Sequence, residues 1–93
     1  MEMKEIHANA TFKVLKVTLA RGEEMPRHYA SSDAFLIPQK GKGLLHLPDR
    51  EVVLEQGGTC HIPDSEPHTL RVLEDFSAFV IMAAGAEIQF TDY

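Results

Sequence analysis

The sequence predicts an all-β domain, built as a small antiparallel sandwich or β-barrel. Hydrophobic and polar residues alternate along most of the chain, whereas helical periodicity is nearly absent. The strand-like segments are short, and turn residues separate them about every eight to twelve residues. With 93 residues, of which 44% are hydrophobic and 25% charged, the chain 1–93 is expected to form one domain with a modest core.

The expected strands follow one another from the N-terminus. The first strong candidate is TFKVLKVTLA at 11–20, because Val and Thr favour the extended conformation. The later candidates are DAFLIPQ (33–39), GLLHLP (43–48), REVVLE (50–55), TCHIP (59–63), HTLRVLE (68–74) and FSAFVIMAA (76–84). Both ends, MKEIHA (3–8) and EIQFTDY (87–93), also have β character. Only REVVLEQ (50–56) has a helical alternative, and it is too short to be a stable helix alone.

Turn signals rich in Gly, Pro and Asp separate these strands. They are ARGEEMP (20–26), QKGKG (39–43), PDR (48–50), QGG (56–58), PDSEP (63–67), EDF (74–76) and AGAE (84–87). The sequence contains no linker, low-complexity tract or internal repeat that would divide the domain.

Charge and cysteine content exclude several classes of partner. Nine Lys and Arg face fourteen Asp and Glu, which gives a net charge of −5 without any basic run. Nucleic acids and anionic membranes need a concentrated basic surface, so neither is expected to bind. The single cysteine, Cys60, excludes an internal disulfide, and the N-terminus lacks the apolar core of a secretion signal. A soluble, cytoplasmic domain is therefore expected.

Two histidines are expected to point into the barrel. Successive side chains of a strand point to opposite faces, so His68 shares a face with Leu70, while Arg71 lies on the other face. Since arginine prefers water, His68 should face inward. The same alternation in RHYA places His28 opposite Arg27, so His28 should also face inward.

These histidines belong to two spaced motifs that resemble those of the cupin superfamily, in its small single-domain form. The first motif is Gly, five residues, His-x-His, three or four residues, Glu, six residues and Gly; its positions here are Gly22, His28, Ala30, Ala34 and Gly41. The second is Gly, five residues, Pro-x-Gly, two residues and His; its positions here are Gly57, Pro63, Ser65 and His68. Together they cover about half of the chain. The resemblance implies a double-stranded jelly roll of the cupin type.

The same resemblance implies a metal site, but this chain departs from it. A metal-holding cupin uses both histidines and the glutamate of the first motif and the histidine of the second. Only His28 and His68 are retained, because Ala30 replaces the second histidine and Ala34 the glutamate. Ser65 replaces the glycine of the second motif, which makes the geometry of that turn an open question.

Three further side chains are candidates to complete a metal site. A stable zinc site needs three or four protein ligands, whereas two imidazoles with water favour copper or nickel. His46 is expected to face outward, and Asp33 would need a β-bulge to turn inward. For His61 the sequence allows either face of the strand. A rebuilt site would hold a divalent transition metal, namely Zn, Ni, Fe, Mn or Cu.

Three functions follow from these residues. The preferred one is a pocket of His28, Ala30, Ala34 and His68 that binds or senses a small molecule, because the two alanines enlarge the cavity. The histidines would then donate hydrogen bonds to an anionic or polar ligand, or act as acid and base near neutral pH. The alternatives are a metal-dependent enzyme, a dioxygenase or isomerase with a substituted ligand set, and a structural module that only dimerises.

A homodimer is expected in each case. The resemblance implies dimers formed by strand exchange or by packing of sheet on sheet. The β character of both chain ends supports this independently, since an unpaired edge strand invites pairing with a second copy.

Overall fold

The computed structural model describes residues 1–91, which form eight strands, all paired in antiparallel fashion, and no helix. The strands are β1 (Glu2–Ala8), β2 (Phe12–Leu19), β3 (Glu24–Ala30), β4 (Ala34–Leu47), β5 (Arg50–Glu55), β6 (Cys60–Ile62), β7 (His68–Ala83) and β8 (Ile88–Phe90). Over the same residues there is accordingly no helix of the length and apolarity that a membrane span requires.

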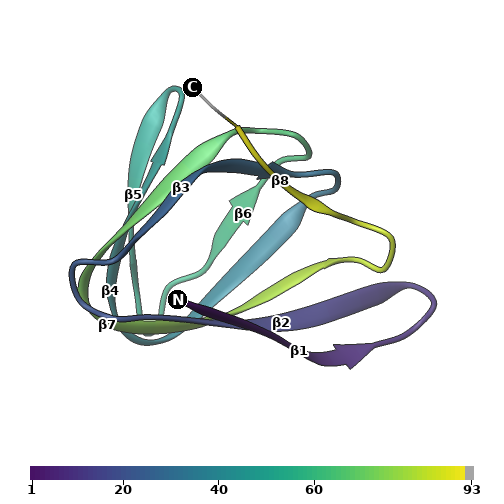
Figure 1. The fold of residues 1–93 in the computed structure, drawn as a ribbon, viewed down its shortest axis with the longest axis horizontal. Coiled ribbons are helices and arrows are strands. Elements are labelled where there is room, and N and C mark those ends of the chain that lie inside the picture. The colour runs from purple at the N-terminus through teal and green to yellow at the C-terminus, as the bar shows by residue number, and fades with distance from the viewer. Residues whose placement is uncertain (92–93) are drawn as a thin grey trace.

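Two long strands, β4 and β7, pair with each other and belong to both layers of the barrel. In the first layer, here called sheet I, β4 pairs with β5 and β7 pairs with β3, which in turn pairs with β8. In the second layer, sheet II, β4 pairs with β6 and β7 pairs with β2, which in turn pairs with β1. Figure 1 shows β7 curving from the upper layer, near β3 and β8, to the lower layer, near β2 and β1. The predicted all-β jelly roll is confirmed.

The bend between the layers lies in the segment 38–43 of β4. Its register against β7 shifts three times there. Gly41 has a φ of 78°, a left-handed conformation that glycine adopts without strain. The inward positions of β4 consequently change from even to odd numbers, with Leu36 buried before the bend and Leu45 buried after it.

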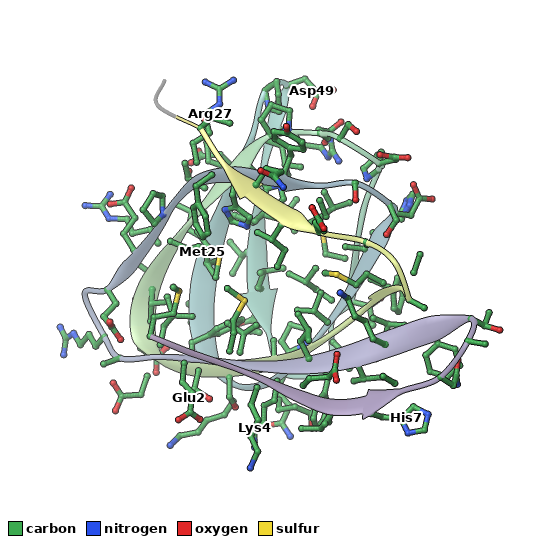
Figure 2. The ribbon with its side chains drawn as sticks, turned by 45° about the vertical axis from the view of Figure 1, so that its right-hand side comes forward. Glu2, Lys4, His7, Met25, Arg27 and Asp49 are labelled. Carbon is green, nitrogen blue, oxygen red and sulfur yellow. The ribbon has the colours of Figure 1, made fainter. Side chains whose placement is uncertain are left out.

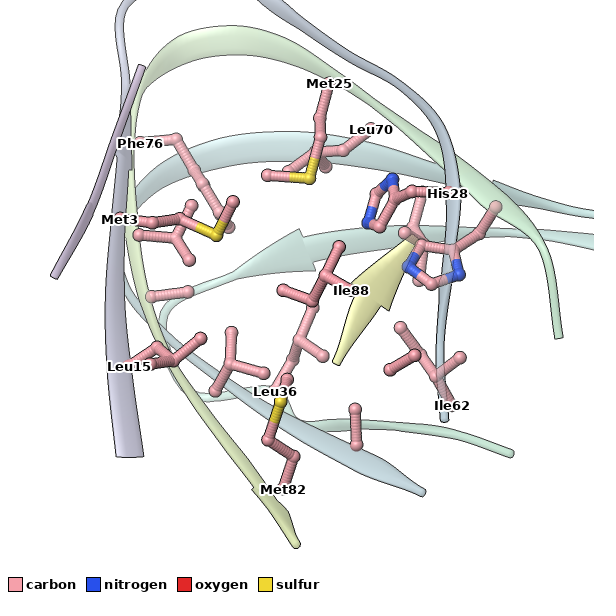
Figure 3. A pocket seen from close by; sticks show the side chains of 17 residues that line it. Met3, Leu15, Met25, His28, Leu36, Ile62, Leu70, Phe76, Met82 and Ile88 are labelled. Atoms are coloured by element: carbon pink, nitrogen blue, oxygen red, sulfur yellow. The ribbon is translucent and has the colours of Figure 1, made fainter. Parts of the chain in front are cut away.

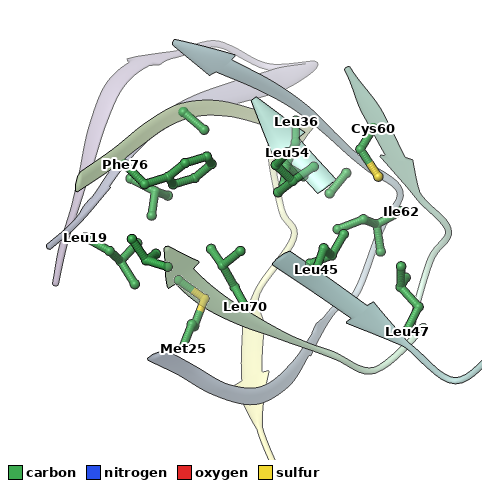
Figure 4. Packing of buried hydrophobic residues seen from close by; sticks show 14 residues of the cluster. Leu19, Met25, Leu36, Leu45, Leu47, Leu54, Cys60, Ile62, Leu70 and Phe76 are labelled. Carbon is green, nitrogen blue, oxygen red and sulfur yellow. The ribbon is translucent and has the colours of Figure 1, made fainter. Parts of the chain in front are cut away.

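Buried side chains from both sheets form the core (Figure 4). The alternation expected for β7 is observed on both sides of the exposed segment 73–75, because Leu70, Phe76 and Ala78 are buried while Arg71 is exposed. Phe76 is the largest fully buried side chain and fills the space next to the bend. Cys60 is part of this core as a small apolar residue with a free thiol.

Several expected element boundaries are wrong. The segments 39–43 and 74–76 do not end strands, because they form the bent middles of β4 and β7. The turn expected at 20–26 is shorter, since β3 already begins at Glu24. REVVLEQ has no helix, because pairing of β5 with β4 satisfies its backbone. β4 and β7 each continue through such a segment from one sheet into the other. Turn residues in the sequence alone do not reveal this.

Candidate functional site

His28 and His68 face each other inside the barrel, as their alternation with arginines predicted. They occupy opposite positions in the ladder between β3 and β7. Their relative exposures are 6% and 7%, and they are the buried polar residues of the described chain. The ring centroids lie 4.1 Å apart, with the planes inclined by 65°. Figure 3 shows His28 at one side of the cavity, with Met3 and Leu15 across from it.

Each imidazole uses one nitrogen to bond the backbone two residues before it. His28 Nδ1 lies 2.7 Å from the carbonyl oxygen of Pro26, and His68 Nδ1 lies 2.9 Å from that of Glu66. A carbonyl oxygen only accepts hydrogen bonds, so each Nδ1 must carry the proton. In the neutral ring Nε2 then carries a lone pair. Within residues 1–91, neither Nε2 atom has a hydrogen-bond partner in the protein, and neither is among the fully buried atoms. Both can therefore accept a hydrogen bond from a ligand.

Both rings stay neutral at neutral pH. Burial is the main cause that lowers the pKa of His28 from 6.5 to about 4, and the neighbouring His68 lowers it further. Burial also lowers the pKa of His68, against the opposing effects of the Glu66 carbonyl and carboxylate. The lowered pKa values therefore do not favour the expectation that these histidines donate to an anion, or act as acid and base near pH 7. Their chemistry at that pH is that of hydrogen-bond acceptors.

The two rings border a cavity of about 50 Å³. Every other side chain that lines it is apolar: Met3, Leu15, Val17, Met25, Ala30, Ala34, Leu36, Leu45, Ile62, Leu70, Phe76, Ala78, Val80, Met82 and Ile88. The structure thus brings His28, Ala30, Ala34 and His68 to one space. Since a cavity of about 10–15 Å³ in this measure already holds one water molecule, this one has room for a small ligand.

Some lining residues were not predicted from the sequence. Met25 and Met82 are buried in the core, as is usual for methionine, and they also line the cavity. Met3 and Ile88 come from β1 and β8, near the two ends of the chain. The ring of Phe90, 51% exposed, lies 5.5 Å from the ring of His28. Alternation in EIQF could have placed Ile88 and Phe90 on one face, but not next to His28, because that depends on pairing of distant segments.

The three candidates for additional ligands lie outside the barrel. His46 faces outward as predicted, and its Nδ1 lies 3.6 Å from a carboxylate oxygen of Glu51. His61 also faces outward, with Nε2 3.1 Å from Oδ2 of Asp33. More than half of the side-chain surface of His46, His61 and Asp33 is exposed. In this structure none of these three side chains is placed to join His28 and His68 around a metal.

The residues present do not fit the metal site that the family resemblance implies. Ala30 and Ala34 line the cavity but have no donor atoms. Within residues 1–91, no group of three or more His, Cys, Asp and Glu is placed to hold an ion. His28 and His68 alone provide two nitrogens, whereas a zinc site in a protein uses three or four protein ligands.

The turn that leads to β7 has Ser65 where the family motif has a glycine. Ser65 has a φ of 63°, in the left-handed region that non-glycine residues seldom adopt. Its N–H donates to the carbonyl oxygen of Ala30 at 2.9 Å, which ties the turn to the end of β3. Asp33 Oδ1 also accepts a hydrogen bond from the Asp64 N–H at 2.8 Å. The turn thereby holds the two histidine-bearing strands together.

The fold is similar to those of several solved structures, each less than 25% identical in sequence. An RmlC-like cupin from Methanocaldococcus jannaschii has a TM-score of 0.79 and 24% identity, over 89% of this chain and 79% of that one. An RmlC-like cupin from Desulfovibrio desulfuricans has a TM-score of 0.76 and 24% identity, over 89% and 81%. DMSP lyase DddQ from Ruegeria pomeroyi has a TM-score of 0.83 and 18% identity, over 90% and 45%.

Sequence comparisons give the family. A search of curated proteins found no match. The family model described as the cupin domain, however, matches residues 15–84, which extend from β2 to the end of β7 and include both histidines and both alanines of the cavity. With this match over most of its length, and with the double-stranded barrel described above, the chain belongs to the cupin family.

Proposed function

We propose that this cupin binds a small, neutral molecule that donates hydrogen bonds to His28 and His68. The observation that supports this most is the pair of Nδ1–H bonds to the Pro26 and Glu66 carbonyls, because they leave both Nε2 atoms as acceptors. The ligand would place a hydroxyl or N–H group within reach of the Nε2 atoms, on the cavity side of the two rings, and an apolar part against the wall that contains Ala30 and Ala34.

Charge and size restrict the ligand further. An anion would lose its hydration and meet two lone pairs instead of donors, so the site disfavours carboxylates and phosphates. A cation would find no carboxylate among the lining side chains. A cavity of about 50 Å³ admits a few non-hydrogen atoms unless flexible side chains, such as Met25 and Met82, move aside.

A metal-dependent dioxygenase or isomerase is the second candidate. Histidines that bind metals commonly donate their other ring N–H to a backbone carbonyl, and His28 and His68 both do so. Enzymes occur among the structures of similar fold, including a salicylate 1,2-dioxygenase from Pseudoaminobacter salicylatoxidans in complex with gentisate. The alanines at positions 30 and 34 oppose this candidate, because they contribute no ligands.

Nuclear magnetic resonance with three probes of equal size tests the proposed ligand class. 2-Propanol donates a hydrogen bond, acetone only accepts one, and acetate is an anion. We expect 2-propanol to shift the Nε2 resonances of His28 and His68 with a millimolar Kd, and acetone and acetate to bind at least about tenfold more weakly. The variant His28→Leu should lose this preference, and His46→Leu, which changes an exposed histidine, should keep it. Equal binding of the three probes would contradict the proposal.

Metal content separates the two candidates. Protein purified without an affinity tag is compared with the double variant His28→Ala, His68→Ala by mass spectrometry. Our proposal predicts substoichiometric Zn, Fe, Mn, Ni and Cu in both proteins. Stoichiometric metal that the double variant loses would favour the enzyme and contradict a neutral organic ligand as the main occupant.

A further inference from the structure

The two histidines and the cavity beside them are covered on almost every side. His28 and His68 are buried, and so are most of the apolar side chains that line the cavity. A ligand therefore needs an element of the barrel to move aside before it can enter. Such an element has to border the cavity, and it has to be held by few contacts.

β8 meets both conditions. It has three residues and pairs with β3 alone, so among residues 1–91 its other edge has no partner strand. Figure 2 shows β8, drawn in yellow, alongside β3 and with Arg27 near its end. Detachment of β8 would release neither β4 nor β7, which connect the two sheets. The match to the cupin domain model ends at residue 84, before β8 begins.

The inner face of β8 covers the site. Phe90 stands opposite His28 in the ladder with β3. Ile88 stands opposite Ala30 and lines the cavity together with the two histidines (Figure 3). The Phe90 ring contacts the His28 ring although about half of its surface stays exposed. β8 thus covers a buried site while it buries little of its own surface.

Ala86 is the fixed end of this segment, and the chain beyond it is held mainly through its backbone. The Ala86 side chain is buried, and its carbonyl oxygen accepts a hydrogen bond from Lys13 Nζ at 2.6 Å. The Ser31 N–H donates to the Glu87 carbonyl oxygen at 3.0 Å. Hydrogen bonds of this kind are replaced by bonds to water when a short edge strand detaches, so their loss costs little.

β6 is equally short but is a poorer candidate to move. It also has three residues and, in the part of the chain that the structure describes, pairs with β4 alone. Its departure would expose the core side chains of Cys60 and Ile62. Asp33 in addition bonds both His61 and the Asp64 N–H, which ties the chain on either side of Ile62.

We propose that β8 is the gate of the cavity and that Ile88 limits the size of the ligand. In the closed state Ile88 fills space that the apolar part of a larger ligand would take, and residues 87–91 swing away from β3 to admit it. A six-membered ring needs a cavity of roughly 150 Å³, whereas the closed cavity has about 50 Å³. This inference rests on the function proposed above, since it takes the two histidines as the binding site.

Hydrogen exchange tests whether β8 opens on its own. The Ser31 and Thr91 amide protons bond to the Glu87 and Arg27 carbonyl oxygens, so they report how residues 87–91 are attached. They should exchange at least about tenfold faster than the amide protons of β7. No ligand is needed, so the outcome does not depend on the proposed ligand class. Equal rates in β7 and at these two positions would overturn the gate.

A disulfide between β3 and β8 tests whether this opening admits a molecule. Tyr29 and Gln89 stand opposite each other, and the Cα atoms of such pairs lie about 4.5–5.5 Å apart, within reach of a disulfide. In a Cys60→Ala background, oxidised Tyr29→Cys, Gln89→Cys should take up xenon, an apolar probe, at least about tenfold more slowly than the reduced form. His46→Cys, Glu51→Cys places the same bond between β4 and β5 and should change nothing. Uptake at equal rates in both redox states of the first variant, or no uptake in either, would overturn the gate.

Shortening of Ile88 tests the size limit. Ile88→Ala should bind cyclohexanol at least about tenfold more tightly than the wild type does, and Ile88→Val should show a smaller gain. Ile6→Ala changes an exposed isoleucine of β1 and should show none. Circular dichroism checks that the variants are folded. Equal affinities of the wild type and of the folded Ile88 variants would overturn the role of Ile88.

Cyclohexanone separates this inference from the function on which it rests. This ketone has nearly the size of cyclohexanol, but it accepts hydrogen bonds and donates none. If Ile88→Ala gains affinity for both compounds equally, the size limit holds and the proposed preference for donors fails. If 2-propanol binds the wild type as expected but Ile88→Ala gains nothing for cyclohexanol, the preference holds and the size limit fails.

Discussion

His28 and His68 illustrate how burial and a backbone carbonyl determine the chemistry of a residue. Their positions follow from alternation, but their protonation follows from the surroundings. The carbonyl oxygens of Pro26 and Glu66 hold the proton on Nδ1, and the apolar cavity disfavours a charge on the ring. A histidine can thus be an acceptor at neutral pH in one fold and a cation in another.

The lowered pKa of His28 predicts a loss of stability in acid. The unfolded chain takes up a proton near pH 6.5, whereas the folded protein takes it up only near pH 4. Stability from the neutral ring is therefore present above about pH 6.5 and is lost as the pH falls through this interval. For His28 we expect the free energy of unfolding in urea to fall by on the order of 2 kcal/mol between pH 7 and pH 5. His28→Leu should reduce this dependence, and an unchanged dependence would contradict a buried neutral ring.

Ser65 gives a second prediction at this scale. A side chain in the left-handed region costs about 1–2 kcal/mol, whereas glycine adds some freedom to the unfolded chain. Ser65→Gly should therefore raise the free energy of unfolding by about 0.5–1 kcal/mol. Ser65→Ala keeps the Cβ atom and serves as the control, with no gain expected. Thermal and urea unfolding measure both variants, and a destabilised Ser65→Gly would show that the hydroxyl bond to Asp64 dominates.

At the scale of elements, the bend of β4 determines which residues face inward. Leu36 and Leu45 are both buried although an odd number of positions separates them, which a regular strand does not allow. The bulge around Gly41 supplies the odd step. Without it, either Leu36 or Leu45 would face water.

β4 should therefore be most sensitive to a substitution at Gly41. A Cβ atom at this position would collide with the backbone carbonyl of Asp75 on β7, and the φ of 78° disfavours a side chain as well. Gly41→Ala should lower the free energy of unfolding by about 3 kcal/mol or more. Gly22→Ala is the control, because Gly22 has a φ of 86° but open space around its Cβ position. The control should cost about 1 kcal/mol, and equal losses would argue against the collision.

For the whole molecule, sequence patterns predicted the fold class and the two inward histidines. Alternation is a local property, so the faces of His28 and His68 could be assigned from Arg27 and Arg71. The spaced glycines and histidines also indicated the cupin family. These features need no knowledge of which strands pair.

The remaining features depend on contacts between distant segments. The cavity includes Met3 and Ile88 because β1 and β8 pair with β2 and β3, which no local pattern reveals. The outward direction of His61 follows from the register of β6 against β4, where it stands opposite Phe35. The proton on Nδ1 of His28 depends on the distance to the Pro26 carbonyl, which sequence alone cannot give.

Sharing of β4 and β7 between both sheets also affects how the chain folds. β5 and β6 lie between β4 and β7 in the chain. The ladder between β4 and β7 therefore closes a large loop before it gains its full set of hydrogen bonds. Folding should accordingly be slow for a domain of this size, in the range of milliseconds to seconds. We expect that neither layer opens while the other stays closed, because each would have to release the same two strands. Amide protons in both halves of β7 should then exchange with solvent at one common rate, that of global opening.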